Sequence, residues 1–194
     1  MKIYYFIILE YKSKELIINK PRLHGKLNEV IQMVKEIHDV KHLEKAGMQV
    51  DEMIKNLKGT DGEILRENFE KYEPKMDVLS ELEEKAKGYL FVVFCADWCR
   101  DCKTNVAAFA KMIKLKPGIN GVFYKGIKTA PKDPDIRWRV PPSPLEVNDF
   151  DLRKIPTIYI VDSNGKLVGE MLENPEHKPT LEEELLFILD NAQG

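Results

Sequence analysis

FVVFCADWCRDCK, the stretch from Phe91 to Lys103, decides the fold. It lies across the end of an apolar run, Tyr89 to Cys95, which is typical of a strand covered on both faces. A short loop follows, and the apolar spacing from about Cys99 to Ile113 predicts an amphipathic helix. The two cysteines of the Cys-x-x-Cys motif, Cys99 and Cys102, are therefore expected where this helix begins.

The position of these two cysteines predicts redox chemistry. Unpaired backbone N–H groups and the macrodipole at a helix N-terminus favour an anion, so the pKa of Cys99 should fall below its ordinary value. Cys102 lies one turn further along, where it can attack a mixed disulfide formed on Cys99 and release the substrate. We therefore expect Cys99 to be the exposed, reactive thiol and Cys102 the shielded one.

Three other roles for the cysteines are alternatives to redox chemistry. A structural disulfide is disfavoured, because closing so short a loop removes only about 2 kcal/mol of unfolded-state entropy. A closed zinc site needs about four ligands, which Cys95 and distant histidines would have to complete. Incidental cysteines are the third alternative. Cys95 itself is expected to be a buried, inert side chain, and His38 to His42, HDVKH, has only a superficial likeness to a zinc-binding helix.

The remaining sequence after the motif alternates between strands and helices. A long loop with five prolines separates the second strand from a short helix, and Ser163-Asn164-Gly165 forms a turn before the last strand. The last helix begins at Thr180, where Glu183 completes a capping box. The expected elements are strands at Val122–Ile127, Thr157–Val161 and Lys166–Leu172, and a short helix near Val147–Arg153.

The sequence before the motif is expected to be mostly helical. Residues 1–20 read as a strand with a hairpin, and helical spacing then recurs over Leu27–Ile37 and Val50–Leu57. Thr60 and Glu63 are expected to form the capping box of the next helix, which Pro74 ends. A further helix runs through Val78 and Ala86 to Gly88. We therefore predict an N-terminal extension, 1–74, followed by an α/β domain, 75–194.

The α/β part resembles the thioredoxin superfamily. The resemblance rests on the strand that leads through Trp98-Cys99-Arg100-Asp101-Cys102 into a helix, and on Ile155-Pro156-Thr157 before a later strand. It implies a central mixed sheet with helices on both faces, Cys99 as nucleophile, Cys102 as resolving thiol and a cis peptide at Ile155-Pro156. It also implies that Trp98 shields the site, that the Ile155 backbone pairs with the substrate, and that no cofactor is required within this chain.

Four positions depart from the family pattern. Val93 stands where thioredoxins usually carry a buried Asp, so the proton acceptor for Cys102 differs. Arg100 and Asp101 replace the usual residues between the cysteines, and their charges should partly cancel at the Cys99 thiolate. Ala107 stands where a helix proline is common. Asp97, Asp101 and Lys103 are close to Cys102 in sequence and could accept its proton through water. A solvated surface is the simpler interpretation of these side chains.

Composition bounds the functional class. The 194 residues are 43% hydrophobic and 32% charged with a formal net charge of −2, so there is no basic excess to attract nucleic acid or an anionic membrane. Arg137-Trp138-Arg139 is a weak nucleic-acid signal by comparison. The apolar stretch Ile3–Leu9 is too short to span a bilayer. We expect a cytoplasmic protein.

The function predicted from these features is intracellular thiol-disulfide exchange. Cys99 and Cys102 would reduce protein disulfides, and an external electron donor such as a thioredoxin reductase would restore the dithiol. Arg100, Asp101 and Trp98 would contact the substrate together with Ile155 and Pro156, and the proline-rich loop from Lys128 to Glu146 would form part of the rim. The alternative is a binding or scaffold module whose helical extension recognises a partner.

Overall fold

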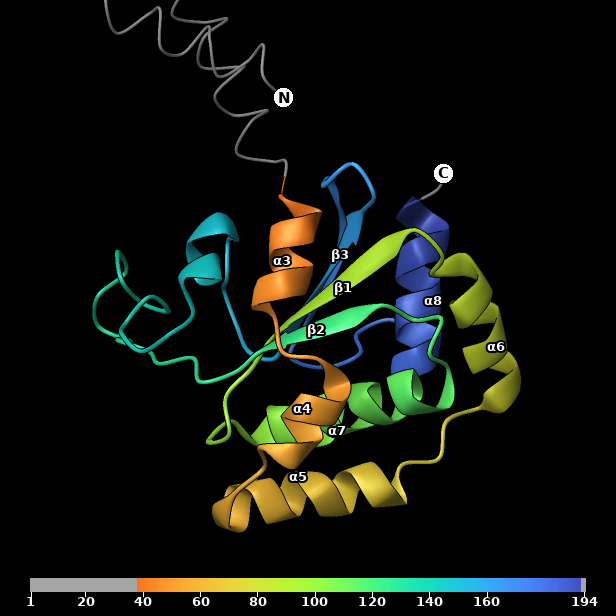
Figure 1. Ribbon diagram of the computed structural model, residues 1–194, viewed down its shortest axis with the longest axis horizontal. Coiled ribbons are helices and arrows are strands. Elements are labelled where there is room, and N and C mark those ends of the chain that lie inside the picture. Colours follow the sequence, from red (N-terminus) through yellow and green to blue (C-terminus); the bar gives the residue numbers. More distant parts are fainter. Residues whose placement is uncertain (1–37, 193–194) are drawn as a thin grey trace, which may run out of the picture. The chain divides into compact units, whose positions relative to one another are not determined.

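A four-stranded mixed sheet is the centre of the computed structural model, which describes residues 38–192 (Figure 1). The strand order is β2-β1-β3-β4. β1 and β2 are parallel, with Phe94 opposite Tyr124, whereas β3 is antiparallel to both β1 and β4. The strands are β1 (Tyr89–Phe94), β2 (Gly121–Tyr124), β3 (Thr157–Asp162) and β4 (Leu167–Leu172). These residues lie within one compact unit, 36–194.

Helices cover one face of the sheet, where they pack on alternate side chains of β1. Phe91 points to this face and packs on Phe109 of α7 (Arg100–Leu115), with ring centroids 5.5 Å apart. α8 (Leu181–Ala192) lies beside α7 and contacts β4. It approaches so closely at Gly169 that a Cβ there would lie 2.3 Å from Ile188. α6 (Met76–Lys85) packs against α8.

The opposite face is covered by an aromatic cluster and by α3 (Val40–Ala46). Phe94 contacts Tyr124, Phe150 and Tyr159, with ring centroids 5.2–6.0 Å apart. Leu43 of α3 is buried, and its carbonyl accepts a hydrogen bond from the Tyr124 hydroxyl. The expected sheet with helices on both faces is thus confirmed.

The helices that precede β1 pack onto this sheet and onto α7. α4 (Val50–Lys55) and α5 (Gly59–Lys71) follow α3, and both contact α7. Met48 and Phe123 exchange two backbone hydrogen bonds, which adds an antiparallel bridge along the free edge of β2. The helical character predicted for this part of the chain is confirmed within 38–74. The strand and helix expected within residues 1–37 lie outside the described residues, and the boundary at residue 74 stays a prediction.

The boundaries of α5 and β2 differ from expectation. α5 begins at Gly59 with Lys58 as N-cap, so Thr60 lies inside the first turn and the predicted Thr60–Glu63 capping box is wrong. The positive φ of Gly59, 65°, favours glycine at that start. β2 ends at Tyr124 and not at Ile127, because its pairing partner β1 ends at Phe94.

The long connection from β2 to β3 is held by local hydrogen bonds. Its short helix, η1, is a 3₁₀ segment at Leu145–Asp149, which begins and ends earlier than the predicted Val147–Arg153. Pro144 precedes it and its carbonyl accepts from the Val147 amide, which fixes the first turn. Figure 1 shows η1 and the rest of this connection projecting from the end of the sheet at which β1 and β2 terminate.

Candidate active site

Cys99 is the N-cap of α7, at the carboxyl end of β1. Its backbone is extended, and its Sγ accepts a hydrogen bond of 3.2 Å from the Cys102 amide. This is the side-chain-to-backbone bond that an N-cap residue supplies, with sulfur in place of oxygen. The site therefore offers an anion at Cys99 one of the unpaired N–H groups of the helix. All three cysteines of the chain are free thiols.

The two thiols of the motif differ in acidity. The pKa of Cys99 is lowered, first because the Cys102 thiol donates a hydrogen bond to its sulfur and then because the Cys102 amide does so. Burial and the Asp101 carboxylate oppose this lowering of the Cys99 pKa. Burial raises the pKa of Cys102 far above its ordinary value. A proton is therefore lost from Cys99 first.

Cys99 is less exposed than the sequence suggested. Its exposed fraction is 6%, compared with 1% for Cys102, so the expectation of an exposed nucleophile is wrong although the order of the two is right. The cause is the loop before β3. The Cys99 thiol donates to the Ile155 carbonyl over 3.3 Å, so this backbone covers one side of the sulfur.

The segment Ile155-Pro156 lies beside Cys99, with a cis peptide bond as predicted. Both residues are buried. The Pro156 carbonyl accepts from the Glu173 amide, and Asn105 of α7 donates to the Glu173 carbonyl over 2.6 Å. These bonds connect the segment to the helix that carries the cysteines.

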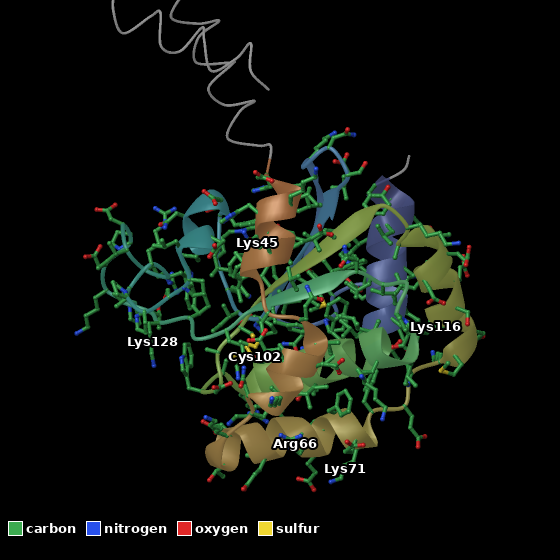
Figure 2. All side chains as sticks on the ribbon, in the orientation of Figure 1. Lys45, Arg66, Lys71, Cys102, Lys116 and Lys128 are labelled. Atoms are coloured by element: carbon green, nitrogen blue, oxygen red, sulfur yellow. The ribbon has the colours of Figure 1, made fainter. Side chains whose placement is uncertain are left out.

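The other predicted substrate-binding residues flank Cys99 in the chain. Trp98 is 47% exposed, and its Nε1 donates to the Ile127 carbonyl over 3.0 Å, which fixes the ring against the start of the long loop. Arg100 is exposed, and Asp101 is half-buried in the first turn of α7. In Figure 2, Cys102 and Lys128 are labelled where α7 begins and where the loop begins.

Sequence reasoning missed an ion pair close to Cys95. Lys125 follows β2 and binds the Asp97 carboxylate over 3.0 Å, and its side chain is only 13% exposed. Burial raises the pKa of Cys95 to about 12, against the opposing effect of the Lys125 charge. Asp97 is thus paired with a cation and not simply solvated. The signal was available, because residues that follow neighbouring parallel strands meet at one edge.

A second interaction that was not predicted from the sequence attaches α5 to the start of α7. Lys103 binds the Asp61 carboxylate over 2.6 Å with its side chain 18% exposed. Asn68 donates to the Lys103 carbonyl over 2.9 Å. Both partners come from α5, so the helical segment before the predicted boundary positions the helix of the cysteines. No local pattern in the sequence shows this contact.

The two histidines of the segment His38–His42 have structural partners. His38 stacks on Phe150 with ring centroids 4.1 Å apart, and His42 lies 3.1 Å from the Glu146 carboxylate. Asp39 caps α3. Within residues 38–192 no group of three or more Cys, His, Asp or Glu side chains could hold a metal ion. Over the same residues, no helix combines the length and apolar character needed to cross a bilayer.

Comparisons with known proteins agree with this geometry. A thioredoxin family model matches residues 47–125, which include α4, α5, α6, β1 and the three cysteines. A comparison with curated proteins finds no match.

Two solved structures share the fold with TM-scores above 0.5. A protein of unknown function from Pseudomonas aeruginosa superimposes with a TM-score of 0.53 at 18% identity, over 80% of this chain and 95% of that one. An HIV epitope scaffold gives 0.52 at 16% identity over the same shares. Spinach chloroplast thioredoxin f, in its short form, gives 0.37 at 15% identity, over 59% of this chain and 85% of that one.

The fold and the site define a thioredoxin-like α/β protein. The thioredoxin family model matches residues 47–125 of this chain, and the fold of the described residues is thioredoxin-like.

Proposed function

We propose that this protein is an intracellular thiol-disulfide oxidoreductase that reduces, or exchanges, protein disulfides through Cys99 and Cys102. The observation that supports this most directly is the hydrogen bonding of Cys99. Its sulfur accepts from the amide and the thiol of Cys102 at the start of α7, which lowers its pKa. A purely structural cysteine pair has no need of such an acidic thiol.

The reaction conserves electrons between two dithiol–disulfide pairs. The Cys99 thiolate attacks one sulfur of the substrate disulfide, the substrate S–S bond breaks, and the other substrate sulfur leaves as a thiolate that takes up a proton. Cys102 then loses its proton and attacks the Cys99 sulfur of the mixed disulfide. The substrate leaves as a dithiol, and the chain holds a Cys99–Cys102 disulfide. An external dithiol donor, such as a thioredoxin reductase, returns the two electrons.

The residues around the sulfurs have proposed roles in binding. The Ile155 backbone, next to Pro156, would pair with the substrate chain, since its carbonyl already contacts the Cys99 sulfur. Trp98 would cover the mixed disulfide from the solvent side. Arg100 and Asp101 would contact the substrate from the first turn of α7.

Two variants test this function. Cys99→Ser should abolish reduction of a protein disulfide such as that of insulin, whereas Cys102→Ser should accumulate a mixed disulfide that is visible by mass spectrometry. Cys95→Ser is the matched control, since Cys95 has a raised pKa and should not be required for turnover. Equal activity of the Cys99→Ser and unmodified proteins would refute the proposal and favour a scaffold role.

A further inference from the structure

A cavity of about 420 Å³ lies between the long loop and the residues that lead to Ile155. We call it the arginine pocket, because Arg137, Arg139 and Arg153 line it. The cavity is within the size range of small-molecule sites, about 300–1,000 Å³, and is ample for one side chain.

The arginine pocket adjoins the candidate active site. Arg153 is only two residues before Ile155, and two residues span at most about 7 Å of extended chain. Ile155 in turn contacts the Cys99 sulfur. A polypeptide bound at Ile155 would therefore bring its neighbouring side chains close to Arg153 and to the pocket that Arg153 lines.

The charges in the arginine pocket leave two guanidinium groups without an acidic partner. Arg153 is bound to Glu170, with Asp151 3.9 Å from its Nε. Arg137 and Arg139 are exposed and make no ion pair with any residue in the range 38–192. Arg137 is oriented by the ring of Trp138, at 5.5 Å from its centroid.

The carboxylates of the pocket do not neutralise these two arginines. Asp135 and Asp151 are both exposed lining residues, and Asp151 faces Arg153. Guanidinium groups bind carboxylates through paired N–H donors. The available charge therefore favours an anionic group of that geometry.

The floor of the arginine pocket is apolar and its wall carries an unused donor. Val147, Phe150 and Leu152 are buried lining residues, suited to the methylene groups of a side chain. Nε1 of Trp138, another lining residue, is the only buried side-chain N or O atom within residues 38–192 that has no hydrogen-bond partner. A buried donor without an acceptor is unfavourable. The pocket therefore combines an apolar floor with a lining residue whose N–H group has no acceptor.

We propose that the arginine pocket binds an acidic side chain of the protein substrate, next to the disulfide that reacts at Cys99. This inference rests on the proposed function and names its substrate class: proteins with Asp or Glu flanking the target disulfide.

Two synthetic disulfide peptides test the preference for an acidic side chain. In the first, Glu stands on both sides of the cysteine that is attacked; in the second, Gln replaces each Glu. The unmodified protein should reduce the Glu peptide with a kcat/KM about five- to tenfold higher, the order expected for two partly exposed charge pairs. In Arg137→Gln/Arg139→Gln this ratio should fall to about one. Lys41→Gln/Lys45→Gln, which removes the same charge from the surface of α3, should keep it. A ratio near one in the unmodified protein, or equal loss in both double variants, would overturn the proposal.

A binding measurement separates this inference from the redox function. In a Trp98→Phe chain the remaining tryptophan is Trp138, so its fluorescence should change on titration with a Glu peptide whose cysteines are replaced by serine. If no peptide is reduced but this change is saturable and requires Arg137 and Arg139, the redox proposal fails and the carboxylate site stands. The absence of any fluorescence change on titration would overturn the proposed carboxylate site. If free glutarate binds as tightly as the peptide, the site takes a small dicarboxylate and the assignment to a protein substrate is wrong.

Discussion

The acidity of Cys99 should depend on the side chain at position 102. Cys102→Ser keeps a hydroxyl donor for the Cys99 sulfur, whereas Cys102→Ala removes it and leaves only the backbone amide. A hydrogen bond to a charged acceptor contributes about 1.5–3 kcal/mol, and we take the lower end of this range. That energy corresponds to about a tenfold smaller thiolate population at a pH below the Cys99 pKa.

The measurement is the rate at which iodoacetamide alkylates Cys99, followed by mass spectrometry from acidic to alkaline pH. Loss of the donor favours the protonated form, so the midpoint should move to higher pH in Cys102→Ala than in Cys102→Ser. The rates should differ about tenfold below both midpoints and converge above them. Cys95→Ala should leave the midpoint unchanged. Identical midpoints in the alanine and serine variants would show that residue 102 does not hold the thiolate.

Three further outcomes are expected. Asn105→Ala should lower the free energy of unfolding by about 1–3 kcal/mol in urea titrations, because the Glu173 carbonyl loses its buried donor; an unchanged midpoint would contradict this. Gly169→Ala should cost about 1–3 kcal/mol through overlap with Ile188, and Ile188→Ala in the same chain should recover part of that loss; additive losses would count against the contact. Shortening the loop Lys128–Glu146 should slow reduction of protein disulfides but not of a small disulfide reagent, and equal rates for both would leave the loop as a structural cover.

The parts of the fold that could be predicted from sequence are those specified locally. The apolar run of β1, the cysteine spacing and the final helix each carry their own pattern, and α8 indeed has the Thr180–Glu183 contact at its start. The cis peptide at Ile155-Pro156 follows from the family resemblance and not from any local sequence pattern. These segments were sufficient to place Cys99 against the loop before β3.

The parts that escaped prediction depend on contacts between distant residues. The pairing of Lys103 with Asp61 and the burial of Lys125 beside Asp97 arise only when α5 and β2 are in place. α3 was missed for a different reason: Asp39 is a helix N-cap, but its histidine neighbours drew attention as metal ligands. The reduced exposure of Cys99 reflects the approach of Ile155, which is far away in sequence.

The burial of Cys95 makes its thiol a probe of structural opening around the sheet. It lies directly after β1, is 3% exposed and has a pKa of about 12, so a thiol reagent reaches it only when the surrounding structure opens. In a chain whose Cys99 and Cys102 are replaced by serine, the slow modification of this one sulfur would time those openings. The same molecule thus carries, four residues before Cys99, a probe of its own folding stability that needs no added label.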